Sequence, residues 1–350
     1  MRIFVAIYED DAHQAENPFA WTLEDAIKEQ HKGIEFVSRK DEFWTDDKWD
    51  IVHVMWPDIF ESYMQEGRNL RERLRFLKNK GAKIISHIHN LKPHTENEIV
   101  CKAYDIVYEE SNIMIHLGTY SLELCKGKYP SKLHVLIPHH IYDTIYSHTI
   151  LSKQEALNYF GYKQGVYAIC FGRVRNARER DLICRAVKAC PNMKFIVPRF
   201  IDIPQGKINK RWIKQRLKRL YYRIKYPNMV ISGKQYVTNE ELPMYYAMAD
   251  ISFIQRIDTL NSGNVPLGMY FGNVIVGPKV GNVERLIDDT GNFSFDPGDT
   301  KSIKRALEVA EEAVMLNKGE ENREYAIHNW NTKHIAAELW QVYKQEAMIK

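Results

Sequence analysis

The chain has 350 residues, 45% of them hydrophobic and 27% charged, so it can form two ordinary domains and is too apolar to be disordered. A net charge of +4 is too small to indicate nucleic acid, and five scattered cysteines without a C-x-x-C pair argue against a disulfide framework or a zinc site. The N-terminus is typical of a strand rather than a signal peptide, and every apolar run is shorter than the roughly 20 residues of a membrane span. These features predict a folded cytoplasmic protein.

In the first part of the chain, short apolar runs alternate with amphipathic stretches. Helices are expected at 22–29 and 69–78. Strands that are almost continuously apolar and alternate with helices predict a parallel sheet covered on both faces. The expected strands are residues 3–7, 34–37, 51–54, 83–86, 106–108 and 133–137.

The pattern pauses after Pro138 and then starts again. The second set of expected strands is 166–171, 194–197, 229–232, 251–254 and 274–276, with helices at 179–190, 239–248, 266–271 and 300–317. The fold class is therefore α/β, with two doubly wound, Rossmann-like domains that face each other across a cleft at the carboxyl ends of their strands. We expect domains at 1–150 and 151–325, with a last helix at 326–350 that packs back towards the first domain.

Polar residues follow the strands of both domains. Histidines and asparagine follow two strands of the first domain, whereas arginines and a Ser-Gly-Asn loop follow two strands of the second. Guanidinium groups and a helix N-terminus bind phosphate, and imidazoles hydrogen-bond hydroxyls, so the pattern indicates a sugar diphosphate site. The alternatives are structural histidines, surface arginines and an ordinary N-capped turn.

His87 and His89 stand two residues apart at the end of an expected strand. We expect their side chains to point to opposite faces of the sheet, so that at most one enters the cleft. The His-x-His spacing also suggests a metal site, but no carboxylate-rich motif accompanies it. We therefore expect no metal.

Several segments resemble the GT-B glycosyltransferases, in particular the retaining bacterial enzymes of exopolysaccharide synthesis (glycosyl transferases group 1). The likeness extends along nearly the whole chain. The segments that carry it are DIVHVMWPD at 50–58, IISHIHNLKPH at 84–94, IPHHIY at 137–142, FGRVRNARERDLI at 171–183 and the stretch from 250 to 287. In IPHHIY, His140 stands where the family has glycine.

The resemblance implies a role for each matching residue. Arg173 and Arg178, the latter in place of the usual lysine, would hold the donor diphosphate, and His89 would lie at the transferred sugar as the catalytic-site residue. No cofactor and no tightly bound metal would be needed, because the cations and a helix dipole stabilise the leaving diphosphate. The remaining implied residues are Ser262, Gly263 and Asn264 at the same phosphates, and Asn90 and His139 near the donor sugar or the domain interface.

The sequence also departs from the family. Thr259 and Leu267 occupy the positions where the family often has two glutamates, the second of which binds the nucleotide ribose, and Glu284 is the candidate substitute for this contact. Glu179 replaces a glycine and brings a negative charge close to the expected phosphate site. A catalytically silent sugar-binding or scaffold protein and a nucleotide-sugar epimerase therefore remain alternatives. A dehydrogenase is not expected, because no G-x-G-x-x-G turn follows the first strand.

Residues 203–226 carry nine Lys or Arg and no acid. Apolar residues recur at three- and four-residue spacing, so a helix there would have one apolar face. Such a helix can lie on an anionic membrane, or it can pack on its own domain with a solvated cationic back. No motif indicates nucleic acid.

The expected function is transfer of a sugar from a nucleotide diphosphate sugar to a glycan or lipid-linked acceptor in surface polysaccharide synthesis. The expected location is the cytoplasm, with the inner face of the membrane as a peripheral alternative.

Overall fold

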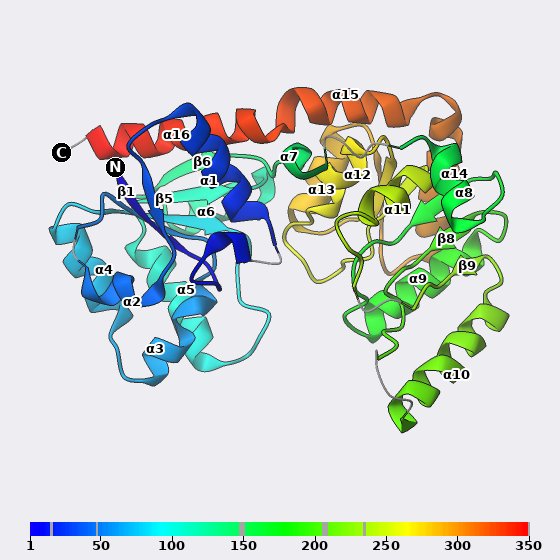
Figure 1. Ribbon diagram of the computed structural model, residues 1–350, viewed down its shortest axis with the longest axis horizontal. Coiled ribbons are helices and arrows are strands. Elements are labelled where there is room, and N and C mark those ends of the chain that lie inside the picture. The colour runs from blue at the N-terminus through cyan, green and yellow to red at the C-terminus, as the bar shows by residue number, and fades with distance from the viewer. Residues whose placement is uncertain (15–16, 47, 147–150, 205–208, 234–235, 349–350) are drawn as a thin grey trace. The chain divides into compact units, whose positions relative to one another are not determined.

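The computed structural model describes residues 1–14, 17–46, 48–146, 151–204, 209–233 and 236–348, and the chain forms two compact units. Unit 1 is Met1–Tyr142 together with Trp330–Lys350, and unit 2 is Asp143–Asn329. Figure 1 shows that each unit has its own sheet with helices around it. Of the expected basic segment, residues 205–208 lie outside the described residues.

The sheet of unit 1 has six parallel strands in the order β2-β1-β3-β4-β5-β6. The strand order reverses between β1 and β3, which is where doubly wound sheets bind ligands, outside the carboxyl ends of the strands. The strands are β1 (Arg2–Ala6), β2 (Glu35–Val37), β3 (Ile51–Val54), β4 (Lys83–Ile88), β5 (Ile113–His116) and β6 (Leu133–Leu136).

The last helix of the chain belongs to the core of unit 1. It contacts α1, where the rings of His31 and Trp340 stack at 4.5 Å, and the Tyr343 hydroxyl lies 2.6 Å from Nδ1 of His53 in the sheet. The helices of this unit are η1 (Ala12–Gln14), α1 (Phe19–Gln30), α2 (Lys40–Thr45), η2 (Pro57–Phe60), α3 (Glu61–Gln65), α4 (Leu70–Asn79), α5 (Glu98–Glu110), α6 (Thr119–Lys128) and α16 (Thr332–Met348).

The strand expected at 106–108 is wrong, because these residues form the last part of α5. The Asn97 side chain caps this helix by accepting a hydrogen bond from the Ile99 N–H at 3.0 Å. Val100, Ala103 and Val107 then recur at helical spacing and are buried, so the apolar run belongs to the inner face of a helix. The strand between β4 and β6 is β5, which follows this helix.

The sheet of unit 2 also has six parallel strands, in the order β12-β11-β10-β7-β8-β9. The strand order reverses between β7 and β10. The expected pair of doubly wound, Rossmann-like domains is therefore confirmed. The strands are β7 (Tyr167–Ile169), β8 (Lys194–Ile196), β9 (Met229–Val230), β10 (Ile251–Phe253), β11 (Val274–Pro278) and β12 (Phe293–Phe295).

Alternate residues of these strands face different helices. Phe253 and Val276 belong to a core shared with α9 and α14, whereas Ser252 faces α12 so closely that a Cβ on Gly268 would lie 2.5 Å from its Oγ. Among the described residues, none of the helices is both long and apolar enough to cross a bilayer. The helices of unit 2 are α7 (Asp143–Tyr146), α8 (Lys153–Phe160), α9 (Ala177–Ala189), α10 (Lys210–Lys225), α11 (Leu242–Met248), α12 (Asn264–Tyr270), α13 (Gly281–Asp289), α14 (Thr300–Met315) and α15 (Lys318–Trp330).

Candidate functional site

Segments after β7 and β10 meet at the carboxyl-end edge of the sheet of unit 2. The Phe171 carbonyl accepts hydrogen bonds from the Gln255 and Asn264 side chains at 2.8 and 3.0 Å. Gly172 has φ +90°, and a Cβ on it would lie 3.0 Å from Nη2 of Arg256. Only glycine tolerates both this backbone conformation and this close approach. The structure thus brings the Gly172 loop, Arg256 and the start of α12 together where the strand order reverses.

The two arginines expected at the donor diphosphate point to different places. Arg173 pairs through Nε with Asp202 at 3.0 Å and faces α10. Arg178 makes two contacts to the Asp258 carboxylate, at 2.8 and 3.0 Å, and lines a separate hollow beside Asp181. Both guanidinium groups are mostly exposed. The structure therefore does not place Arg173 and Arg178 in one pocket.

Glu179 does not present a free negative charge to this edge. Its carboxylate is almost completely buried, pairs with Nη1 of Arg256 at 2.6 Å and accepts the Arg175 backbone N–H at 2.7 Å. Its own N–H donates to the Asn176 cap at 2.9 Å. The Glu179 carboxylate, which we expected beside the phosphate site, is therefore part of the protein interior. It holds the loop after β7 against Arg256.

The Ser-Gly-Asn segment leads into α12, where the Ser262 carbonyl accepts the Val265 N–H at 3.1 Å and the Gly263 carbonyl accepts the Leu267 N–H at 3.2 Å. Leu267 is buried in the core. Leu267 stands at the position where the family's second glutamate binds the ribose, and its buried side chain is not available to contact a ligand at the edge of the sheet.

Glu284 lies in the first turn of α13, after β11. In the same turn the Asn282 side chain donates to the Asn261 Oδ1 at 2.7 Å, so the start of α13 is linked to the loop that carries Ser262. This link puts Glu284 on an element that borders the same edge.

Five stacked rings form a column at the carboxyl-end edge of the sheet of unit 1. The expectation that His87 and His89 point to opposite faces is wrong, because residues two positions apart on a strand share a face; past the end of β4 at Ile88, the His89 N–H also turns back to the His87 carbonyl at 3.0 Å. The column runs from solvent inward as Tyr8, Trp56, His89, His87 and His53, with successive ring centres 5.9, 4.7, 4.8 and 5.4 Å apart.

Phe19, the first residue of α1, joins this column to the segment after β6. Its ring centre lies 4.8 to 5.2 Å from the rings of His87, His89, His139 and His140. His140, which stands in place of the family's glycine, is fully buried with Nε2 2.8 Å from the Thr22 hydroxyl. It is therefore a structural residue.

Burial keeps these imidazoles neutral at pH 7. It lowers the pKa of His53 and His89 to about 3 and that of His139 to about 4, and holds the pKa values of His87 and His140 well below 6.5. His89 can therefore donate or accept a hydrogen bond but cannot supply an acid proton. Neighbouring rings stack face to face, and the described part of the chain holds no group of three His, Cys, Asp or Glu side chains placed for a metal ion.

Three residues at the β1/β3 switch point were missed. The Tyr8 hydroxyl, after β1, donates to the Asp58 carboxylate at 2.5 Å, and Trp56 stacks on both Tyr8 and His89. An aromatic face beside a carboxylate is suited to a sugar, whose ring presents C–H groups and hydroxyls. The signal was present in the Trp-Pro-Asp that follows the third expected strand.

The other two expected residues of unit 1 are held by neighbours. The Tyr108 hydroxyl donates to the Asn90 carbonyl. His139 Nδ1 lies 2.7 Å from the His140 carbonyl, and its Nε2 lies 3.3 Å from the hydroxyl of Tyr142, a non-glycine residue with φ 59°. Such strained backbone is concentrated at functional sites.

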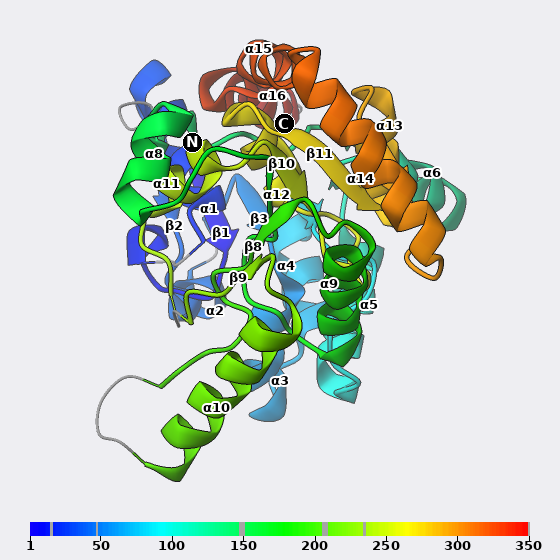
Figure 2. The same ribbon diagram turned by 90° about the vertical axis from the view of Figure 1, so that its right-hand side faces the viewer.

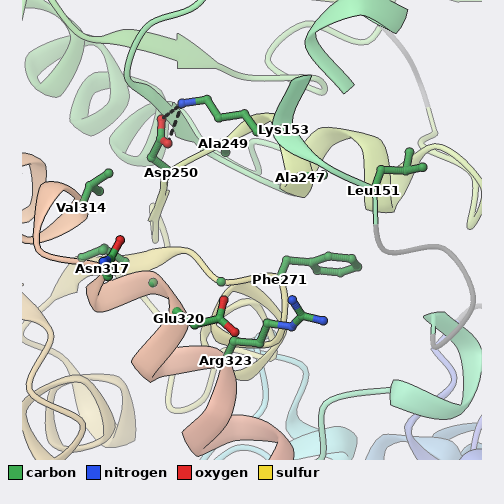
Figure 3. A pocket seen from close by; sticks show the side chains of 13 residues that line it. Leu151, Lys153, Ala247, Ala249, Asp250, Phe271, Val314, Asn317, Glu320 and Arg323 are labelled. Atoms are coloured by element: carbon green, nitrogen blue, oxygen red, sulfur yellow. Dashed lines mark hydrogen bonds and ion pairs between the residues drawn. The ribbon is translucent and has the colours of Figure 1, made fainter. Parts of the chain in front are cut away.

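Another hollow, of about 440 Å³, lies at the opposite edge of the sheet of unit 2 (Figure 3). Lys153 contacts both Asp250 oxygens there, at 2.6 and 2.7 Å, and Asp250 also accepts the Tyr167 N–H at 2.9 Å. These contacts connect the starts of β7 and β10, whereas ligands of such sheets bind at the strand ends. We therefore assign this hollow a structural rather than a ligand-binding role.

No protein-family model and no curated protein matches the sequence. Solved structures do match over the full length. Sucrose-phosphate synthase from Thermosynechococcus elongatus is 13% identical with a TM-score of 0.73 and covers 100% of this chain and 99% of its own. The catalytic domain of starch synthase IV from Arabidopsis thaliana, bound to ADP and acarbose, is 12% identical with a TM-score of 0.69 and 99% coverage of each chain. HepE from Anabaena in complex with UDP is 11% identical with a TM-score of 0.68 and covers 98% of this chain and 99% of its own. The chain therefore has the GT-B fold of these glycosyltransferases.

Proposed function

We propose that the protein is a glycosyltransferase that moves a sugar from a nucleotide diphosphate sugar to a glycan or lipid-linked acceptor in surface polysaccharide synthesis, with retention at the anomeric carbon. The observation that carries this proposal is the meeting of the Gly172–Arg173 loop, Arg256 and the start of α12 at the switch point of unit 2. Structures of the same fold that hold UDP, UDP-glucose or ADP support it.

The donor diphosphate would bind at the edge of unit 2. Arg173 pairs with the half-buried Asp202 and Arg178 with the exposed Asp258; both guanidinium groups are open to solvent, and such surface pairs contribute only about 0–1 kcal/mol, so phosphate oxygens can replace these carboxylates at little cost. Cations at the leaving diphosphate stabilise the charge that builds up there. We infer that they make a tightly bound metal unnecessary, so activity should survive EDTA.

The acceptor and the transferred sugar would contact unit 1. We infer that a sugar ring stacks on Trp56 and Tyr8 and that a hydroxyl binds Asp58, because these groups surround the switch point of that sheet. Neutral His89, stacked behind Trp56, would hydrogen-bond the transferred sugar, with Asn90 and His139 beside it.

The nucleotide ribose needs a partner other than the family's acid. We propose Glu284 for this contact, because Leu267 is buried and the Thr259 hydroxyl donates to the Asn261 carbonyl at 2.6 Å. The missing acids also keep a silent sugar-binding protein as the second candidate.

A membrane location is proposed from α10, which lies at the periphery of unit 2 in both Figure 1 and Figure 2. Its apolar stripe, Ile213, Leu217, Leu220 and Ile224, is 48–73% exposed. The domain-facing side instead carries Arg219, whose Nε donates to the Ile231 carbonyl at 2.9 Å. An outward apolar stripe with cations on both sides and no acid matches an anionic bilayer.

The donor is tested by thermal shift with UDP-, GDP- and ADP-linked sugars, because a bound ligand raises the melting temperature. We expect one nucleotide to bind and Arg173→Ala to remove the shift, while Arg305→Ala on the exposed surface of α14 keeps it. Product analysis then separates transfer from epimerisation, and binding without turnover would identify a silent protein. No response to any nucleotide would refute the proposal.

The membrane is tested by co-sedimentation with vesicles that contain phosphatidylglycerol, compared with vesicles of phosphatidylcholine alone. We expect binding to the anionic vesicles that Leu217→Ser with Ile224→Ser abolishes. Leu316→Ser, which removes a leucine outside α10 that is at least as exposed as these two residues, is the matched control. Equal binding of both variants would refute a role of α10.

A further inference from the structure

A second cationic pocket lies in unit 2, between the loops after β7 and β8 and one face of α10. Its volume is about 190 Å³. We call it the α10 pocket. Its lining includes one carboxylate, Asp202, and six cations, Arg173, Arg175, Arg180, Arg199, Arg211 and Lys218.

Little in the described structure balances this charge. Asp202 pairs with Arg173 at the exposed rim, and among the described residues none of the other five cations of the lining has an ion-pair partner. The Nε atoms of Arg180 and Arg199, and one oxygen of Asp202, are buried and lack a hydrogen-bond partner in the same described set. Buried guanidinium donors are normally satisfied, and here the unpartnered donors outnumber the single unpartnered carboxylate oxygen, so the pocket lacks an acceptor.

The cations are held in place despite their mutual repulsion. Burial and the neighbouring Arg180 and Lys214 lower the pKa of the Lys218 ammonium, which reflects this repulsion. The Arg180 guanidinium lies over the Phe200 ring at 5.8 Å. The Val174 N–H donates to the Arg199 carbonyl at 3.3 Å and so joins the two loops. A preformed cationic pocket of this kind gains stability from a multivalent anion.

The helix α10 presents its pocket residues on the side that faces the domain. Arg211, Gln215 and Lys218 recur at four- and three-residue spacing, and Tyr222 continues this side and packs against Phe200 with ring centres 4.8 Å apart. The apolar stripe is on the opposite face of the helix, since residues two positions apart, such as Arg211 and Ile213, lie roughly 200° apart around the helix axis. A ligand in the pocket is therefore separated by the helix from any surface that the stripe contacts.

We propose that the α10 pocket binds a phosphate-bearing small molecule, through a phosphate monoester or a diphosphate group, at a site additional to the donor diphosphate. The planar forks of several arginines match phosphate oxygens, and five unbalanced cations fit a group with at least two negative charges. The volume is below the roughly 300 Å³ at which sites for whole drug-sized ligands begin, so the pocket takes the phosphate end of its ligand. The site shares Arg173, at its rim, with the proposed donor site but goes beyond it, because Arg178, Arg256 and Asn264 do not line the pocket.

Isothermal titration of the full chain with inorganic pyrophosphate, and with inorganic phosphate, tests the proposal. We expect saturable binding that Arg199→Gln and Lys218→Gln each weaken by roughly tenfold, as the loss of a charge-assisted contact does. Asp202→Asn should strengthen binding several-fold, because it removes the carboxylate of the lining. Arg305→Gln, the same charge change on exposed α14, should leave it unchanged. Circular dichroism confirms that each variant is folded.

Three outcomes would overturn the inference. One is the absence of pyrophosphate binding by the wild-type chain. The second is binding that Arg178→Gln abolishes and Arg199→Gln retains, or that a saturating nucleotide sugar displaces, since the site would then be the donor site. The third is binding of phosphatidic acid vesicles, but not of pyrophosphate, that depends on Arg199, because the source would then be a lipid headgroup. If the chain binds pyrophosphate but no nucleotide, the proposed function is refuted and the inference about the α10 pocket stands.

Discussion

The carboxyl-end edges of the two sheets occupy the same topological position, but one is lined by neutral aromatic rings and the other by positively charged side chains. In unit 1 the edge is a column of neutral, stacked rings around Phe19, whereas in unit 2 it is a set of arginines around Gly172 and α10. Position in the fold therefore says where a ligand binds, and the side chains decide what kind. The first edge should respond to protons and packing, and the second to anions and salt.

Acidification should give the largest difference between the units. The imidazoles of unit 1 have lowered pKa values in the fold, to about 3 for His53, so their contribution to stability is complete above pH 6.5 and is lost as the pH falls towards 3. At pH 5.5 each should cost about 1 kcal/mol, and several together exceed most single mutations. Hydrogen exchange, corrected for its intrinsic pH dependence, should show β4 losing protection while β10 keeps it.

Unit 2 provides the control for this measurement. Its range contains His148, which lies outside the described residues, and the exposed His328. Equal loss of protection in β10 would mean that the imidazole column is not the acid-sensitive element.

Among single substitutions in unit 1, removal of the Phe19 ring should reduce the stability most. Phe19 is 1% exposed and contacts four imidazoles, so Phe19→Ala should lower the free energy of unfolding by roughly 3–5 kcal/mol. Phe19→Leu, which keeps most of the volume, should cost clearly less. Urea denaturation followed by tryptophan fluorescence measures both, and equal losses would show that ring stacking, rather than volume, holds the column together.

Glu179→Ala tests the buried charge of unit 2. It leaves the Arg256 guanidinium, 10% exposed, without its partner, so we expect a loss of roughly 3–5 kcal/mol. Glu179→Gln keeps a hydrogen-bond acceptor for the Arg175 N–H and should cost less. A stable alanine variant with normal nucleotide binding would contradict the structural role of this carboxylate.

The smallest effect on stability should come from Asp258→Asn. Its pair with Arg178 is exposed on both sides, so the free energy of unfolding should change by less than about 0.5 kcal/mol. Because the substitution frees Arg178, nucleotide-sugar affinity should rise at low salt, and this gain should shrink as salt screens the charges. Tighter binding that is independent of salt would contradict this explanation.

The sequence was sufficient to predict the two parallel sheets, because buried parallel strands leave continuous apolar runs. The same signal was misleading at residues 106–108, where β-branched residues line the inner face of α5 and only its Asn97 cap marks a helix. Short apolar runs cannot be divided between strand and buried helix by periodicity alone.

The sequence was sufficient to predict that the site residues follow strand ends, but not which side chains each of them contacts. The stacking of His89 on His87 is the exception, because residues two positions apart on a strand share a face. The α10 pocket combines Arg180 with Arg199 and Lys218, which come from three separate elements. Such a group exists only once the loops after β7 and β8 lie side by side.

The position of α16 affects the order in which the units can be completed during synthesis. The segment from Trp330 onwards belongs to unit 1, and its Tyr343 contacts His53. Unit 1 is therefore the first unit whose synthesis begins and the last whose residues are all synthesised. Domains of a growing chain generally fold as units, and unit 2 is contiguous, so it can finish while unit 1 waits for its final helix. A ribosome that stops before residue 330 would release a chain whose second half is whole and whose first half is not.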